Sequence, residues 1–177
     1  IANKIKDKKN KKEHSKWPLV SILIAAYNED LVIEAKIKSI LSSSYPIEKI
    51  EIIIGTDNCT DKTDDLIRKF ADLHENIHHV QFKERSGKIK IINSIVDIAT
   101  GELLILTDAN VLFTENTIET LVNQFTDSKV GLVDSNMKSF GMKSTGISIP
   151  EKAYISLEGK LKNAEGKLWG SMMGPFG

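Results

Sequence analysis

Two side chains with oxygen donor atoms, Asp108 and Asn110, follow the apolar run 103–106 after Thr107 and are separated only by Ala109. A carboxylate and an amide at this spacing can reach a divalent cation or a ribose hydroxyl, because hard cations prefer oxygen ligands. Asp108 could equally cap a following helix, and this segment alone favours neither interpretation. The choice depends on which other residues the fold brings to this place.

Three other polar clusters also follow apolar runs, at residues 27–29, 57–60 and 85–88. An aromatic ring and several carboxylates suit a base and a ribose, whereas Lys88 and a metal at Asp108 suit phosphates. If the apolar runs are parallel strands, their carboxyl ends meet at one edge of a sheet. The four clusters would then line a single crevice, which favours a nucleotide site.

The apolar patterning predicts the elements that would position these clusters. Short apolar runs predict buried strands at residues 20–26, 50–54, 77–82, 103–106 and 130–133. The run 103–106 is expected to be buried on both faces, as in a parallel sheet. Helical spacing of apolar residues predicts helices between the strands, and the helix at 89–99 is apolar around much of its circumference and is expected to be deeply buried. Alternating strands and helices indicate an α/β fold with a mostly parallel sheet.

The order of several motifs resembles a known family: PLVSILIAAYNE (18–29), IIIGTDNCTDKT (52–63), ERSGK (84–88), Asn93 and ATGELLILTDAN (99–110). This order and spacing resemble the nucleotide-binding half of family 2 inverting glycosyltransferases. The resemblance implies the GT-A fold of nucleotide-diphospho-sugar transferases, which is an α/β/α sandwich with a mostly parallel sheet. The later SLEGKLKNAEGKLWGSMMGPFG (156–177) is similar to the linker before that family's acceptor region.

The resemblance also implies roles for individual residues. The expected nucleotide-binding residues are Ala25, Tyr27, Glu29, Asp57, Lys88 and Asp108. The first three would line the uridine, Asp57 would bind the uracil or the ribose, and Lys88 would lie near the diphosphate. Asp108 and Asn110 would hold a divalent cation, Mn²⁺ or Mg²⁺. Asn110 stands where the family usually has Asp, and its amide brings no negative charge, so we expect a weaker metal site.

The function implied by the resemblance is sugar transfer with inversion from a nucleotide-sugar, UDP-linked, to an acceptor hydroxyl. The acceptor would be a glycan or a lipid-linked molecule, in polysaccharide or glycoconjugate synthesis. The family's acidic general base is expected beyond Gly177, so this chain is expected to bind the donor without turning it over alone. Two alternatives stay open. A sugar nucleotidyltransferase would need a Gly-rich basic loop where this chain has AAYNE, and a catalytically inactive nucleotide-binding module is favoured by Asn110.

Composition and charge narrow the class of protein. The chain has 177 residues, 41% of them hydrophobic and 27% charged, which is ordinary for a globular protein. It has neither a G-x-G-x-x-G after the first strand nor a P-loop, which argues against dinucleotide dehydrogenases and P-loop enzymes. Residues 1–16 carry a net charge of +5 and residues 17–177 a net charge of −5, so the main part is expected to be a poor nucleic-acid binder.

The predicted domains are a flexible Lys-rich leader (1–16), a GT-A nucleotide-sugar-binding domain (17–135) and the start of an acceptor-side region (136–177). The leader is expected to be a solvated tail rather than a membrane-surface anchor. No apolar run is long enough to span a membrane, so we expect a cytoplasmic location, with association at the membrane face left to segments outside this chain.

Three further side chains have competing interpretations. Cys59 is expected to pack structurally rather than act as a nucleophile, because no neighbouring cation in the sequence lowers its pKa. Arg85 could clamp a phosphate or form a salt bridge, with equal weight. Asp61 is expected to serve the start of the second helix.

Overall fold

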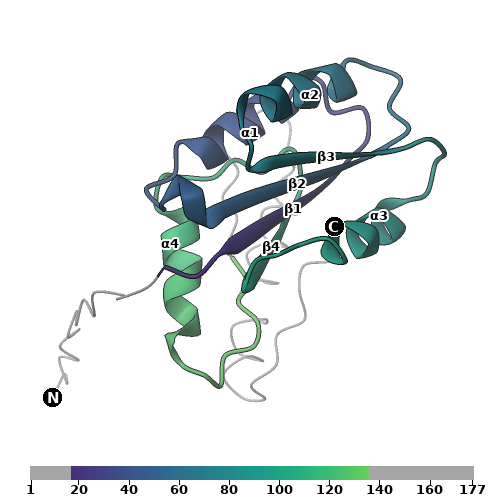
Figure 1. Ribbon diagram of the computed structural model, residues 1–177. Helices are drawn as coiled ribbons and strands as arrows, with labels where there is room; N and C mark the ends of the chain where they lie inside the picture. The colour runs from purple at the N-terminus through teal and green to yellow at the C-terminus, as the bar shows by residue number, and fades with distance from the viewer. Residues whose placement is uncertain (1–16, 136–177) are drawn as a thin grey trace, which may run out of the picture. The chain divides into compact units, whose positions relative to one another are not determined.

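The structure, a computed structural model, describes residues 17–135, in which strands and helices alternate along the chain (Figure 1). The strands are β1 (Val20–Ala26), β2 (Ile50–Asp57), β3 (Ile77–Phe82) and β4 (Leu103–Thr107). The α-helices are α1 (Ile33–Leu41), α2 (Thr63–Leu73), α3 (Lys88–Val96) and α4 (Thr117–Val122). Two short 3₁₀-helices are η1 (Ile47–Lys49) and η2 (Asn123–Thr126).

The four described strands form one parallel sheet in the order β3-β2-β1-β4. Val20 of β1 pairs with Ile50 on one side and with Leu103 on the other. The carboxyl ends of the strands therefore lie at the same edge of the sheet, with Ile24 opposite Thr107 and Asp57 opposite Phe82. The predicted α/β architecture with a parallel sheet is confirmed.

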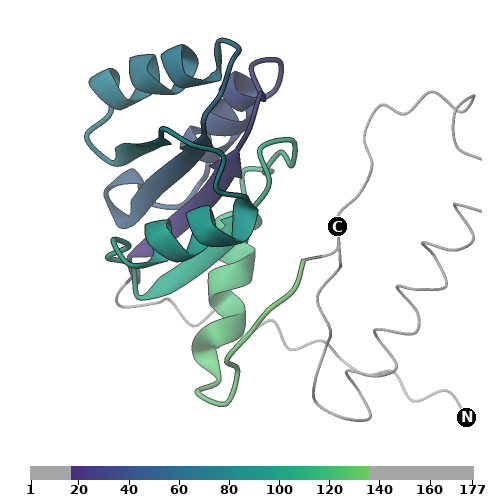
Figure 2. The same cartoon turned by 90° about the vertical axis from the view of Figure 1, so that its right-hand side faces the viewer.

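Helices cover both faces of the sheet, as the alternating side chains of the strands require. Ile22 and Ile24 of β1 belong to the larger apolar core, together with buried residues of α1, α2 and α4. Leu23 points to the opposite face, where it packs in a smaller core with Ile53 and Ile95 of α3. Figures 1 and 2 show α3 on the side of the sheet away from α1 and α2. The arrangement is the predicted α/β/α sandwich.

A glycine in β2 allows α3 to approach the sheet closely. A Cβ atom added to Gly55 would lie 2.3 Å from Cγ2 of Ile91 and 3.2 Å from Cγ2 of Ile95. No other residue type fits this contact without displacing the helix side chains. The beginning of α3 is thereby held near the carboxyl end of β2.

Two details of burial differ from the sequence prediction. β4 is not buried on both faces, since the side chains of Leu104 and Leu106 are 42% and 58% exposed. β4 lies at an edge of the described sheet, and α3 contacts β1 and β2 instead. The prediction of a deeply buried helix at 89–99 is also wrong, because α3 ends at Val96 and Ile89 is 80% exposed.

The predicted strand at 130–133 is absent from the described part of the chain after η2. Val130 instead donates a backbone hydrogen bond to the carbonyl of Asp127, as in a turn. The described residues belong to two separate compact units, one that ends at Asn123 and one that begins at Gln124. The predicted domain limits stay predictions, and residues 1–16 and 136–177 lie outside the described part.

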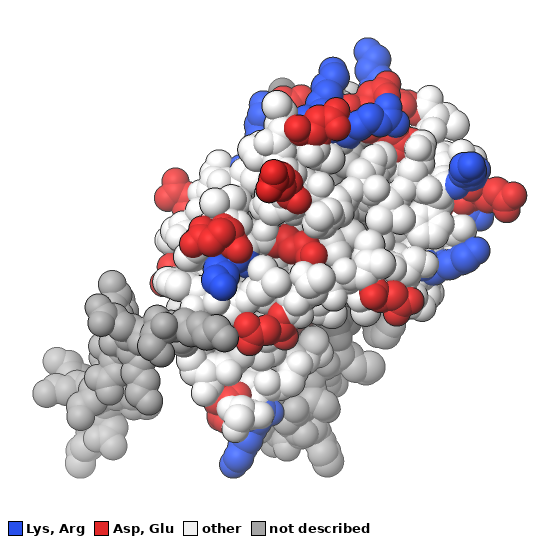
Figure 3. Space-filling view, in the orientation of Figure 1, with Lys and Arg blue, Asp and Glu red and all other residues white. Residues whose placement is uncertain are grey.

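The surface of the described residues carries both signs of charge. On the face shown in Figure 3, acidic and basic side chains lie close together around wide uncharged areas. Within residues 17–135, no helix combines the length and the apolar character needed to cross a bilayer.

A buried carboxylate ties together the amino-terminal end of the sheet. Glu51 of β2 is 8% exposed and accepts hydrogen bonds from the hydroxyl of Ser21 and from both the backbone N–H and the hydroxyl of Thr100. Burial acts to raise the pKa of Glu51, but these hydrogen bonds and nearby His78 outweigh it and leave the pKa below its usual value. The carboxylate therefore links β1, β2 and the segment that leads into β4.

Replacing Glu51 by Gln should destabilise the fold at neutral pH by about 2 kcal/mol, because an acceptor of charge-assisted hydrogen bonds is lost. The folded-state pKa lies below the usual 4.5, so the stabilisation is present above pH 4.5 and is lost as the pH falls through the folded-state pKa. Urea unfolding of both chains from pH 7 down to pH 3 should show the difference shrinking at low pH. Glu48→Gln, at an exposed carboxylate in η1, is the matched control. A difference that is independent of pH would show that the charge of Glu51 is not involved.

Candidate functional site

A crevice lies at the carboxyl edge of the sheet, where the four polar clusters meet. Its lining residues come from the ends of β1, β2 and β4 and from the start of α3: Ala25, Ala26, Tyr27, Glu29, Asp57, Arg85, Lys88, Ile91, Asp108, Ala109 and Asn110. The structure thus places every nucleotide-binding and metal-binding residue predicted from the sequence in one crevice. Their roles in binding stay predictions.

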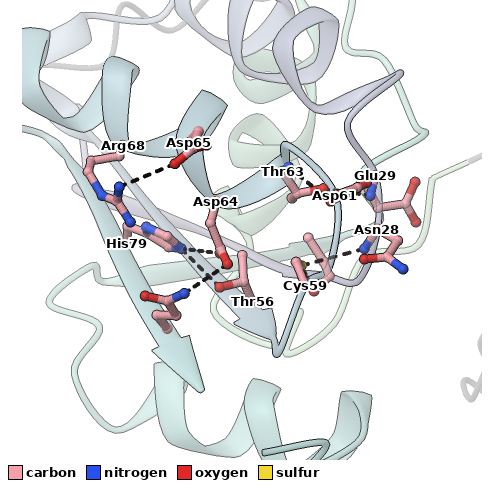
Figure 4. A network of polar contacts seen from close by, with 12 residues as sticks. Asn28, Glu29, Thr56, Cys59, Asp61, Thr63, Asp64, Asp65, Arg68 and His79 are labelled. Carbon is pink, nitrogen blue, oxygen red and sulfur yellow. Dashed lines mark hydrogen bonds and ion pairs between the residues drawn. The ribbon is translucent and has the colours of Figure 1, made fainter. Parts of the chain in front are cut away.

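The loop after β1 is held by the loop after β2. Asn28 has a left-handed backbone with φ of 54°, a conformation that asparagine tolerates better than most residues. Its side chain accepts a hydrogen bond from the N–H of Thr60 at 2.9 Å and donates one to the Thr60 hydroxyl at 3.1 Å. The N–H of Glu29 donates to the hydroxyl of Thr63 at 2.8 Å (Figure 4). These contacts position Tyr27 and Glu29 at the rim of the crevice.

Asp57, the last residue of β2, anchors the loop between β3 and α3. Its carboxylate accepts hydrogen bonds from the backbone N–H of Ser86 at 2.6 Å and of Gly87 at 3.1 Å, and pairs with Nε of Arg85 at 3.2 Å. The Ser86 hydrogen bond is the largest influence on the pKa of Asp57, which lies below its usual value although burial opposes the shift. Gly87 has φ of 80°, so the turn before α3 favours glycine. The sequence did not predict this anchoring role.

Arg85 links two of the predicted nucleotide-binding residues. Its guanidinium carbon lies 3.4 Å from the ring centroid of Tyr27, a cation–π contact, while its Nε pairs with Asp57. The sequence left open whether Arg85 clamps a phosphate or forms a salt bridge, and the structure shows the salt bridge, with Asp57. The guanidinium therefore covers one face of the aromatic ring.

Lys88 and Asp108 form an ion pair across the crevice, with Nζ of Lys88 2.6 Å from Oδ1 of Asp108. Both side chains are at least half exposed. Asp108 does not cap a helix, because the next helix, α4, begins only at Thr117. The helix-capping interpretation of Asp108 is thus wrong, and its carboxylate faces the crevice beside Asn110.

Comparison with known proteins decides the family. The family model described as "Glycosyl transferase family 2" matches residues 21–174. The chain belongs to glycosyl transferase family 2.

Individual relatives agree with this assignment. The chain is 30% identical over 143 residues to a beta-monoglucosyldiacylglycerol synthase from Nostoc, covering 80% of this chain and 31% of the relative. It is 29% identical over 156 residues to a poly-beta-1,6-N-acetyl-D-glucosamine synthase from Staphylococcus epidermidis, covering 88% of this chain and 37% of the relative. This chain therefore spans about a third of the length of these relatives.

A solved structure with a similar fold is the mannosyltransferase PcManGT from Pyrobaculum calidifontis, in complex with GDP-Man and Mn²⁺. The two are 31% identical with a TM-score of 0.63, and the match covers 68% of this chain and 37% of the mannosyltransferase. This likeness supports the GT-A fold predicted from the family resemblance.

The donor atoms of this family 2 site fit a cation that is shared with a bound diphosphate. Asp108 and Asn110 offer one carboxylate and one amide oxygen toward the crevice. In residues 17–135, no group of three or more His, Cys, Asp and Glu side chains is suited to hold a metal. A hard cation takes six or more oxygen ligands, so the remaining ones would have to come from the nucleotide and from water.

A lysine that was not predicted from the sequence lies behind this family 2 motif. Lys36 of α1 is fully buried, and its ammonium donates hydrogen bonds to residues on either side of Asp108 and Asn110. The available signal was its spacing, because Lys36 lies three residues after Ile33 and directly before Ile37, within the apolar stripe of α1.

Other candidate residues have structural contacts. Burial raises the pKa of the Cys59 thiol, and its Sγ lies 3.5 Å from the N–H of Asn28, which supports the expected packing role. Asp61 accepts a hydrogen bond from the N–H of Thr63 at 2.9 Å and serves the start of α2 as expected. His79 lies between Asp64 and Thr56, so its ring is part of a polar contact between α2 and the sheet (Figure 4).

Asp57→Asn should loosen the loop before α3, because an amide oxygen can replace only part of the acceptor capacity of a carboxylate. Hydrogen exchange at the amides of Ser86 and Gly87 should become about tenfold faster, equivalent to about 1.4 kcal/mol. Asp65→Asn, at an exposed position of α2, is the control and should leave both amides unchanged. Unchanged exchange in Asp57→Asn would show that other contacts hold the loop.

Proposed function

We propose that the crevice binds the nucleotide diphosphate of a UDP-linked sugar, and that the intact protein transfers this sugar with inversion to an acceptor hydroxyl. The observation that carries the proposal is the meeting of Tyr27, Asp57, Lys88 and Asp108 at the carboxyl edge of a parallel sheet. In open α/β sheets, ligands bind at this edge. Membership of glycosyl transferase family 2 supplies the class of reaction.

The base and the ribose are assigned to the half of the crevice formed by β1 and β2. The ring of Tyr27 is 40% exposed and has an arginine over one face, so a base can stack on the ring by displacing or joining Arg85. Asp57 would share its carboxylate between the nucleotide and the loop it anchors. Ala25 and Glu29 complete this half of the lining.

The diphosphate is assigned to the half formed by α3 and β4. Lys88 has three N–H donors, of which its ion pair with Asp108 uses one, so the others can reach a phosphate, while the second carboxylate oxygen of Asp108 can reach a cation. Mn²⁺ or Mg²⁺ held by Asp108, Asn110 and the diphosphate would offset the charge that builds on the leaving group. Lys88 would add a second positive charge near the same oxygens.

In the transfer step, the acceptor oxygen attacks the anomeric carbon from the side opposite the diphosphate. The new glycosidic C–O bond forms as the bond between the anomeric carbon and the phosphate oxygen breaks, and UDP leaves with that electron pair. The acceptor proton passes to a carboxylate base. We assign this base to a part of the intact protein outside residues 17–135.

The acceptor is proposed to be a glycan or a lipid-linked molecule, in polysaccharide or glycoconjugate synthesis. Two relatives support this class, since one is named for a glucosyldiacylglycerol and the other for a poly-N-acetylglucosamine. We place the intact enzyme at the cytoplasmic face of a membrane, held there by segments outside this chain.

Calorimetry with UDP and GDP tests the choice of base, because the mannosyltransferase of similar fold was solved with GDP-Man. The chain should bind UDP more tightly than GDP. Asp57→Ala should weaken UDP binding by about 1–3 kcal/mol, the cost of losing a charge-assisted hydrogen bond. If Asp57 recognises the base, the preference for UDP over GDP should shrink in this variant. Equal losses for both nucleotides would mean that Asp57 acts only by anchoring its loop.

Metal and nucleotide should bind cooperatively, because one carboxylate and one amide attract a hard cation only weakly. Titrations of UDP with and without Mn²⁺, and of Mn²⁺ with and without UDP, should show each ligand raising the affinity of the other by the same factor. Asn110→Asp should tighten Mn²⁺ binding without nucleotide, and Asp108→Asn should abolish the coupling. UDP affinity that is indifferent to Mn²⁺ would remove the metal from the proposed function.

A further inference from the structure

A buried cation supports the metal-binding turn from behind. Lys36 of α1 is fully buried, although lysine is among the residues least often found in protein interiors. Its ammonium donates hydrogen bonds to the hydroxyl of Thr107 at 2.9 Å and to the backbone carbonyl of Val111 at 2.5 Å. These two acceptors lie immediately before Asp108 and immediately after Asn110.

The third contact of the ammonium is aromatic. Nζ of Lys36 lies 3.7 Å from the ring centroid of Phe113, where the electron-rich face of the ring stabilises a cation. In residues 17–135, no carboxylate oxygen lies within ion-pairing distance of this nitrogen. Burial lowers the pKa of Lys36 to about 7, and the charge of Asp108 opposes the shift.

A buried cation without an ion-pair partner is costly for the folded state. An apolar side chain of similar length would continue the stripe of Ile33, Ile37 and Ile40 on α1 without that cost. Both hydrogen bonds of the ammonium go to the segment that carries Asp108 and Asn110, and its aromatic contact, Phe113, follows on the same segment.

Most other hydrogen bonds of that segment lie beyond the turn itself, since the N–H of Phe113 donates to the hydroxyl of Ser39 at 3.1 Å and the carbonyl of Glu115 accepts from the N–H of Ser44 at 2.9 Å. Within the turn, Ala109 is buried in the apolar core. Residues 108–116 contain no helix or strand, and the turn has one internal backbone hydrogen bond, from the N–H of Val111 to the carbonyl of Asp108 at 3.3 Å. Lys36 closes this turn at both ends, because one nitrogen holds the residue before it and the residue after it.

We infer that Lys36 is a positioning residue, which holds the turn 107–111 so that Asp108 and Asn110 face the cation and the diphosphate together. This inference rests on the proposed function for the identity of the ligand. The geometry of the turn itself does not depend on that proposal. Removal of the ammonium should therefore impair ligand binding while relieving the cost of a buried charge.

The test compares Lys36→Met with Lys38→Met in the full 177-residue chain. Lys38 lies on the same helix, but its side chain is 62% exposed and pairs with Glu34, so this variant is the matched control. Lys36→Met should lower the affinity for Mn²⁺ measured by electron paramagnetic resonance in the presence of UDP by about 10- to 100-fold, as for residues that orient metal ligands. Its melting temperature should stay the same or rise. A residue that only supported the fold would lower stability and binding together.

A second variant covers the case in which Lys36→Met does not fold. Thr107→Val keeps the cation and removes one of its two acceptors, so it should cause a smaller loss of Mn²⁺ affinity. Combining it with Lys36→Met should add no further loss, because both changes remove the same hydrogen bond. Wild-type affinity in either folded single variant would overturn the inference.

Hydrogen exchange at the Val111 amide separates this inference from the proposed function. That amide should exchange faster in Lys36→Met than in the wild type or in Lys38→Met, with no ligand present. If the wild type did not bind Mn²⁺ with UDP but Val111 exchange still rose, the proposed function would fail and the positioning role would stand. Unchanged exchange would overturn the positioning role whatever the ligand proves to be.

Discussion

The alignment of strand ends is the constraint on which the rest of the site depends. Three neighbouring strands run parallel and stop at one edge, so residues that are more than eighty positions apart, such as Ala25 and Asp108, line one crevice. Register in a parallel sheet is specified by which side chains must be buried, and a slip of one residue would reverse the faces of a strand. Ile22 and Ile24 are fully buried on one face of β1 and Leu23 on the other, so the apolar core holds this strand from both faces. The location of the crevice thus follows from the apolar core.

Alignment alone does not place the functional side chains, because loops beyond strand ends have many conformations. In this chain, each loop is tied by a side chain from another element. Thr60 and Thr63 hold the loop after β1, Asp57 holds the loop before α3, and Lys36 holds the turn after β4. Four of the five predicted binding side chains with charged or aromatic groups are exposed or partly exposed, whereas the supports Asp57, Thr63 and Lys36 are buried. A change in one of these supports would alter the site without touching the ligand.

The sequence predicted the strands at the centre of the sheet and the clusters that follow them, since a short and almost wholly apolar run such as Val20–Ala26 is typical of a strand covered on both faces. The predicted burial was wrong where it depends on neighbours far along the chain. Leu104 and Leu106 are apolar but exposed, because α3 lies over β1 and β2 rather than over β4. Periodicity did not separate a turn from a strand at 130–133. The role of Lys36 required knowledge of which segment lies beside α1, although a lysine within an apolar stripe was a visible sign.

The central claim is that nucleotide and metal bind at the carboxyl edge of the sheet, and paramagnetic broadening tests it most directly. Substoichiometric Mn²⁺ with UDP would be added to the ¹⁵N-labelled chain, with Mg²⁺ and UDP as the diamagnetic control. Broadening falls steeply with distance from the ion, so the amides of Lys88, Asp108 and Asn110 should lose intensity first. The amides of Ser21, Glu51 and Thr100, at the opposite end of the sheet, should stay sharp. Broadening centred on that opposite end, or spread evenly over the chain, would contradict a site at the carboxyl edge.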